Sequence, residues 1–199
     1  MKVLLLPFNI ASKGAITIDA LNRINGVEAK GVFVSKNKGV ASSEFARHFE
    51  VYSFRENPIG WTSNYIKKSL YINKMIKWAD VLHWIWDSGF SSQWDLKLAR
   101  ALKKPGIIEW SGSDIRYPER NFEINPHASL LYNPEYEYKH IETKENSFRR
   151  QEKFSKMGFA PLVTPEMDLY IRNDLFPKSY TTLHRLNTKD FRGANPGNA

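Results

Sequence analysis

Short apolar runs alternate with amphipathic segments along most of the chain. The runs are almost continuous in aliphatic and aromatic residues, which is typical of strands covered on both faces. In the segments between them, apolar residues recur at helical spacing. We expect strands over 2–8, 29–34, 49–54, 81–86, 106–110 and 159–163, and helices over 15–24, 64–79, 94–102, 145–157 and 165–171.

This alternation predicts the fold class. Repeated strand–helix units build an α/β fold, a Rossmann-like doubly wound parallel sheet with helices on both faces. We expect a single domain over 1–190, with an irregular excursion over 116–138 where the periodicity is lost. Residues 191–199 are rich in turn residues and should form a flexible, disordered tail. No apolar run approaches the roughly 20 residues of a membrane-spanning helix.

Composition restricts the chemistry and the partners. The 199 residues include no cysteine, which excludes disulfides, thiolate metal sites and cysteine nucleophiles. Lys and Arg number 29 against 21 Asp and Glu, a net charge of +8, which favours anionic partners such as nucleotides, nucleic acids or acidic membranes. The first residues lack the features of a signal peptide, so we expect a cytoplasmic location.

Common phosphate and metal motifs are absent. Lys13 precedes Gly14, the reverse of the order in a Walker loop, and the G-x-G-x-x-G fingerprint of dinucleotide sites is missing after the first strand. The five histidines form no H-E-x-x-H motif and no close pair, and no D-x-D motif occurs. We therefore expect neither a resident metal nor a cofactor.

Three polar loops follow predicted strands, at 9–15, 83–89 and 111–116. In doubly wound sheets such loops line the ligand crevice. The amides that begin the helix at Ala15 can hold a diphosphate, although Gly14 also fits an ordinary turn. Asp114 fits either a helix cap or a cleft, and His83 fits either a hydrogen-bonded core or acid–base chemistry.

The order of these segments resembles the N-terminal domain of GT-B glycosyltransferases of the family-4-like group. The resemblance rests on the strand at 80–86, the helix at 95–102 and the strand and Gly-Ser-Asp loop at 104–116, with the first strand and its glycine loop. It implies the acceptor-binding half of a metal-independent, usually retaining transferase. Its partners would be a nucleotide-sugar co-substrate, a sugar or lipid-linked acceptor, and a C-terminal donor domain that this sequence lacks, supplied in cis or in trans.

The resemblance also assigns roles to the strand-end loops. It places Lys13, Gly14 and Ala15 near the donor diphosphate, and Gly112, Ser113 and Asp114 on the acceptor side. Arg116 has the guanidinium geometry to bind a phosphate through two parallel hydrogen bonds, with pairing to Glu119 or Glu123 as the alternative.

The candidate catalytic residues come from a departure from the family pattern. In many members the fifth strand ends in a histidine that contacts the reacting sugar, whereas this chain has Trp110. Asp87, just past the fourth strand, and His83 within it become the candidates, with a surface-loop role as the alternative for Asp87.

A basic face on the predicted helix 64–79 indicates a membrane contact. Lys67, Lys74 and Lys77 lie beside Leu70 and Trp78, and each lysine near an anionic surface contributes about 1 kcal/mol. Membrane-associated relatives carry such residues on this domain, so we expect peripheral contact with an anionic inner membrane face. A solvated lysine face is the alternative.

Two other functions fit the composition. A basic nucleic-acid-binding module would combine phosphate attraction with base stacking on some of the six tryptophans. The tryptophans lie in or beside predicted buried elements and the lysines are dispersed, so we expect no nucleic-acid partner. A non-catalytic, glycosyltransferase-like subunit is the other alternative.

Overall fold

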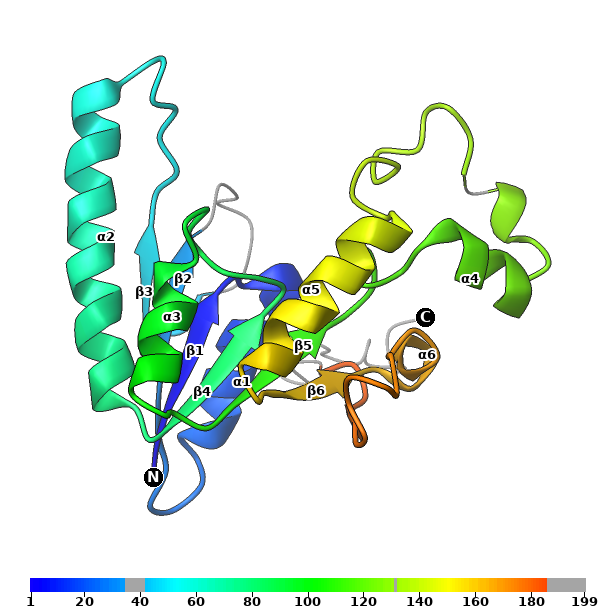
Figure 1. The fold of residues 1–199 in the computed structure, drawn as a ribbon. Helices are drawn as coiled ribbons and strands as arrows, with labels where there is room; N and C mark the ends of the chain where they lie inside the picture. Colours follow the sequence, from blue (N-terminus) through cyan, green and yellow to red (C-terminus); the bar gives the residue numbers. More distant parts are fainter. Residues whose placement is uncertain (35–41, 131, 186–199) are drawn as a thin grey trace, which may run out of the picture.

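Parallel strands form the centre of the protein, whose computed structural model describes residues 1–34, 42–130 and 132–185. In this part of the chain seven strands form one sheet in the order β3-β2-β1-β4-β5-β6-β7, and every neighbouring pair is parallel (Figure 1). The strands are β1 (Lys2–Pro7), β2 (Glu28–Val34), β3 (Ala46–Phe49), β4 (Val81–Ile85), β5 (Gly106–Trp110), β6 (Ala160–Val163) and β7 (Tyr180–Thr181).

Helices connect the strands. In the described residues, the α-helices are α1 (Lys13–Leu21), α2 (Pro58–Trp78), α3 (Trp94–Ala101), α4 (Pro118–Ile124), α5 (Lys144–Lys156) and α6 (Pro165–Asp168), and two 3-10 turns are η1 (Ile10–Ser12) and η2 (Ala128–Leu130). The fold class predicted from the sequence is confirmed, including the doubly wound parallel sheet. The predicted tail at 191–199 lies outside the described residues.

Two apolar cores cover the two faces of the sheet. On one face, Leu5 and Phe33 pack with Ile18 of α1. On the other face α2, α3 and α5 contribute a larger core that includes Trp84 and Trp110. Successive side chains of a strand point to opposite faces, which explains why β1 reads as an unbroken apolar run and why His83 alone interrupts the apolar run of β4.

The order of the strands reverses between β1 and β4. From β1 the chain moves outward through β2 and β3, then returns across α2 to place β4 on the other side of β1. The loops that leave these two strands therefore diverge, and open α/β sheets bind ligands in the crevice at such a switch point.

The long helix α2 begins at Pro58, earlier than the predicted start at 64. Asn57 caps it by accepting a hydrogen bond from the Gly60 amide at 2.8 Å, and proline is favoured at the first helical position. The third strand ends at Phe49, so the predicted 49–54 was wrong. Phe54 packs against Trp61 of α2, with ring centroids 5.3 Å apart.

Residues 116–138 are less irregular than predicted, because α4 and η2 form there and extend outward from the sheet (Figure 1). This excursion is anchored by the buried carboxylate of Glu142. Arg116 Nη2 donates to Glu142 Oε1 at 2.6 Å and the Tyr132 hydroxyl donates to Oε2 at 2.8 Å. The next helix, α5, packs on the sheet and buries Gln151 and Phe154.

Candidate functional site

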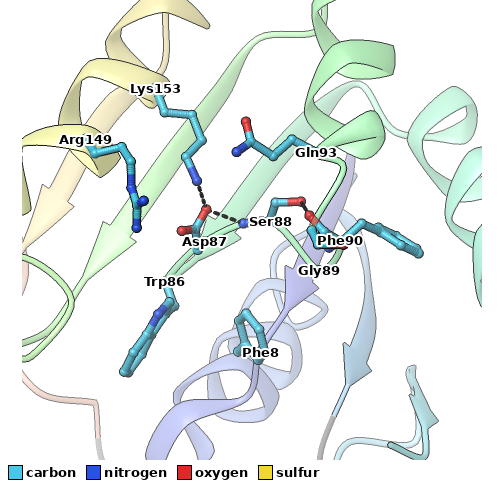
Figure 2. A pocket seen from close by; sticks show the side chains of 10 residues that line it. Phe8, Trp86, Asp87, Ser88, Gly89, Phe90, Gln93, Arg149 and Lys153 are labelled. Atoms are coloured by element: carbon cyan, nitrogen blue, oxygen red, sulfur yellow. Dashed lines mark hydrogen bonds and ion pairs between the residues drawn. The ribbon is translucent and has the colours of Figure 1, made fainter. Parts of the chain in front are cut away.

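A pocket lies at the switch point, where β1 and β4 end (Figure 2). Its volume is about 460 Å³. The residues that line it come from the loops after β1 and β4, from the start of α3 and from one face of α5: Phe8, Trp86, Asp87, Ser88, Gly89, Phe90, Ser91, Gln93, Arg149 and Lys153.

Asp87 occupies the middle of the pocket and is held by two cations. Lys153 Nζ donates to Asp87 Oδ1 (Figure 2), and Arg150 Nε lies 3.6 Å from Oδ2. The side chain of Asp87 remains 23% exposed, so the carboxylate is both oriented and accessible. Such a carboxylate can accept a hydrogen bond from a ligand hydroxyl.

Arg150 joins two of the strand-end loops. Its Nη1 donates to the carbonyl oxygen of Asp114 at 2.6 Å while its Nε faces Asp87. Burial lowers the pKa of Arg150, and the carboxylates of Asp87 and Asp114 oppose that shift. The loop after β4 is therefore tied to the loop after β5 from α5.

Two aromatic side chains form the opposite wall of the pocket. Trp86 has a left-handed backbone, with φ of 77°, and its carbonyl accepts a hydrogen bond from Trp110 Nε1 at 3.1 Å. Its ring meets Phe8 edge to face at a centroid distance of 6.5 Å. A tryptophan at positive φ is strained, and such strain clusters at functional sites.

Asp95 holds the loop after β4, which lines the pocket. It is buried, and it accepts hydrogen bonds from Ser88 Oγ at 2.5 Å and from the Gly89 amide at 3.1 Å. Burial raises the pKa of Asp95, and these hydrogen bonds counteract the rise. The loop after β4 is thus held in shape by α3.

His83 does not line this pocket. It is buried, and its Nε2 lies 2.9 Å from Glu109 Oε2, while Arg185 donates to the other oxygen of Glu109. Burial alone would raise the pKa of Glu109, but the hydrogen bonds from His83 and Arg185 lower it to about 2. The structure therefore separates the two candidate catalytic residues, and His83 fits the hydrogen-bonded core alternative.

The predicted diphosphate loop is closely packed. The Ala15 amide donates to Asn9 Oδ1 at 3.0 Å, and a Cβ on Gly14 would lie 2.6 Å from Phe33 Cζ. Lys13 is buried at the start of α1. Gly14 therefore permits contact between α1 and the sheet, and the diphosphate role of these three residues stays a prediction.

The predicted acceptor loop is folded around its own aspartate. The buried carboxylate of Asp114 accepts hydrogen bonds from the amides of Ser111 at 2.9 Å and Gly112 at 2.7 Å, and burial raises its pKa. Arg116 pairs with Glu142 instead of Glu119 or Glu123. Ser113 is half-buried beside them. The acceptor role of these residues stays a prediction.

The predicted membrane residues lie along α2. Lys67, Lys74 and Lys77 are exposed, whereas Trp78 is half-buried with the Lys30 ammonium 4.6 Å above its ring. No helix in the described part of the chain is long and apolar enough to cross a membrane.

Sequence reasoning missed Arg149 and Lys153, which enter the pocket from α5 (Figure 2). Their i, i+4 spacing puts them on one face of the helix, a signal that resembles an ordinary solvated face.

Within residues 1–34, 42–130 and 132–185, no three His, Asp or Glu side chains cluster in a way that could hold a metal ion.

Comparisons with known proteins add little. No protein-family model matches the chain, and no curated protein matches it. Among solved structures, the chain is similar to a crystal structure of UDP-GlcNAc 2-epimerase from Neisseria meningitidis bound to UDP-GlcNAc, with a TM-score of 0.37 and 12% identity over 94% of this chain and 73% of that chain. A likeness this distant carries no argument about function.

Proposed function

We propose that this chain is the acceptor-binding half of a metal-independent glycosyltransferase and binds a sugar that carries a negative charge. The observation that carries the proposal is the pocket at the switch point, where the accessible Asp87 carboxylate lies between aromatic and cationic walls. Ligand pockets of this kind combine apolar surface with a few oriented polar groups.

Each wall fits a different part of such a ligand. The faces of Phe8 and Trp86 offer apolar surface for the C–H groups of a sugar ring. Arg149 and Lys153 supply donors for a phosphate or carboxylate. Asp87 would accept a hydrogen bond from the hydroxyl of the acceptor.

The proposed reaction needs groups that a donor domain, in cis or in trans, would contribute. The acceptor oxygen would form a bond to the anomeric carbon while the bond from that carbon to the diphosphate breaks. The hydroxyl proton would leave toward a base, for which Asp87 is the candidate, and the nucleoside diphosphate would depart with the electron pair. The resemblance to GT-B glycosyltransferases supplies this reaction.

The shape of the pocket favours this function over a nucleic-acid module. Strand-binding proteins stack successive bases on aromatic faces along an open groove. Here Phe8 and Trp86 meet edge to face inside a concave pocket. They are not arranged as a stacking platform.

The test is a nuclear magnetic resonance titration with glucose 6-phosphate, glucose 1-phosphate and a thymidine hexanucleotide as probes. We expect the sugar phosphates to shift the amide signals of residues 86–93. Asp87→Asn should weaken binding about tenfold, because a charge-assisted hydrogen bond is lost. Asp174→Asn, the same change at an exposed carboxylate away from the pocket, should leave binding unchanged.

Two results would contradict the proposal. One is a response to the oligonucleotide with none to either sugar phosphate. The other is binding that Asp87→Asn and Asp174→Asn weaken to the same extent.

A further inference from the structure

A second cavity continues from the pocket along the surface. It lies between α3 and α5, has a volume of about 330 Å³ and shares Gln93, Arg149 and Lys153 with the first. Leu96 and Met157 contribute apolar side chains to it. We call this second cavity the α3–α5 groove.

Cations from both helices line the α3–α5 groove. Lys97 and Arg100 come from one turn of α3, and Arg149, Lys153 and Lys156 come from α5. The α5 residues follow an i, i+4, i+7 pattern, so they form one row. At 1.5 Å per residue the row is about 10 Å long.

Few acids oppose these charges. Among the described residues that line the groove, Glu152 is the one carboxylate, and it is paired with Arg172 at 3.1 Å. Lys153 is paired with Asp87 in the first pocket. Within the described chain, the side chains of Lys97, Arg100 and Lys156 are exposed and have no hydrogen-bond or ion-pair partner.

We infer that the α3–α5 groove binds a second negative group of the same ligand, so that the acceptor is an acidic oligosaccharide with carboxylates or phosphates on successive units. This inference rests on the proposed function. The reacting sugar occupies the pocket beside Asp87, and the next acidic group lies in the groove between Lys97, Arg100 and Lys156.

The chemistry of the groove distinguishes this ligand from others. Among the described residues, no aromatic side chain lines the groove, so these residues offer no surface on which bases could stack, and an acidic glycan fits the groove better than a nucleic acid. Like charges gathered along a concave surface raise the local concentration of an anion. An anionic group that enters also removes the repulsion among these side chains.

The test compares ligands of equal length and different charge. The probes are a galacturonate hexasaccharide, which carries a carboxylate on every sugar, a neutral cello-hexasaccharide and glucose 1-phosphate, measured by calorimetry at low salt. The groove variant is Lys97→Gln with Arg100→Gln, because both residues are exposed on α3 and neither lines the first pocket. Lys67→Gln with Lys74→Gln, on α2, is the control with about the same change in charge.

We expect the acidic hexasaccharide to bind more tightly than the neutral one. The groove variant should lose about tenfold in affinity for the acidic hexasaccharide, since charged hydrogen-bond donors are removed, and should bind glucose 1-phosphate as before. The α2 control should bind every probe like the unchanged protein.

The outcomes separate the two proposals. Glucose 1-phosphate binding at the pocket without a preference for the acidic hexasaccharide would overturn the inference and leave the proposed function standing. Equal losses in the groove and α2 variants would also overturn it, because the effect would then be one of net charge. Binding of the acidic hexasaccharide that depends on Lys97 and Arg100, with no effect of Asp87→Asn on any probe, would support the groove and contradict the proposed function.

Discussion

Gly14 and Gly112 both lie in segments that the sequence predicts as binding loops, yet their surroundings differ. A Cβ on Gly14 would meet buried ring atoms of Phe33 at 2.6 and 2.9 Å, whereas a Cβ on Gly112 would meet nothing within 4 Å. Overpacking a core costs about 1–3 kcal/mol, and alanine regains up to about 1 kcal/mol of helix propensity within α1.

We therefore expect Gly14→Ala to lower the free energy of unfolding by about 1 kcal/mol and Gly112→Ala to leave it within about 0.5 kcal/mol. Urea denaturation of the two variants measures both values. Equal stability of the two variants would show that Gly14 is not needed for the contact between α1 and Phe33.

Glu109 gives the stability a specific dependence on pH. Its pKa in the folded protein is about 2, below the ordinary 4.5, so its stabilisation is present above pH 4.5 and is lost as the pH falls toward 2. Between pH 5 and pH 3 the loss should be about 2 kcal/mol.

Urea denaturation at pH 5 and pH 3 tests this expectation. Glu109→Gln should show a smaller fall than the unchanged protein, even if it is less stable at both pH values. Asp95 and Asp114, whose pKa values are raised by burial, are present in both proteins and cancel in the comparison. If the free energy of unfolding falls equally with pH in both proteins, Glu109 does not contribute to the loss of stability in acid.

At the scale of elements, α2 presents an unusual outer face. Ile59, Ile66 and Leu70 are exposed to 82%, 52% and 66%, and they lie on the helix side that also carries Lys74 and Lys77. Apolar side chains flanked by lysines are typical of helices that lie in the headgroup region of a membrane. The face is thus more apolar than a solvated lysine face.

We expect the protein to sediment with phosphatidylglycerol vesicles at low salt. Replacing Lys67, Lys74 and Lys77 by glutamine should reduce the affinity about a hundredfold, at about 1 kcal/mol for each lysine. Replacing Lys97, Arg100 and Lys156 by glutamine, which removes the same number of charges, serves as a control for net charge. Sedimentation that is the same with and without vesicles would exclude the membrane contact.

The strands also show which sequence patterns are sufficient to predict an element. The apolar runs of β1, β4 and β5 appear within one or two residues of their predicted places, because strands covered on both faces need continuous apolar sequence. The sequence analysis missed the two-residue β7, since its side chains are exposed and, among the described strands, it pairs with β6 alone. The predicted position of the third strand, 49–54, was wrong because Phe54 packs on α2 instead of continuing the strand.

At the scale of the whole molecule, the pocket is assembled from segments far apart in the chain. Phe8 follows β1, residues 86–93 follow β4, and Arg149 and Lys153 come from α5. The net charge of +8 does not by itself identify a partner. The partner depends on which basic side chains have no acidic side chain beside them. In the α3–α5 groove, Lys97, Arg100 and Lys156 are such side chains.

The sequence by itself determined the fold class and most of the elements, and it placed Asp87 at the end of a buried strand. These features depend on local periodicity, which is written along the chain. The tertiary structure decided which polar groups are hydrogen-bonded within the protein and which are open to a ligand. Asp114, Arg116 and the Ala15 amide all have partners within the fold. It also decided which basic residues enter the pocket, since helix packing brings α5 over the end of β4 and no local pattern encodes that contact.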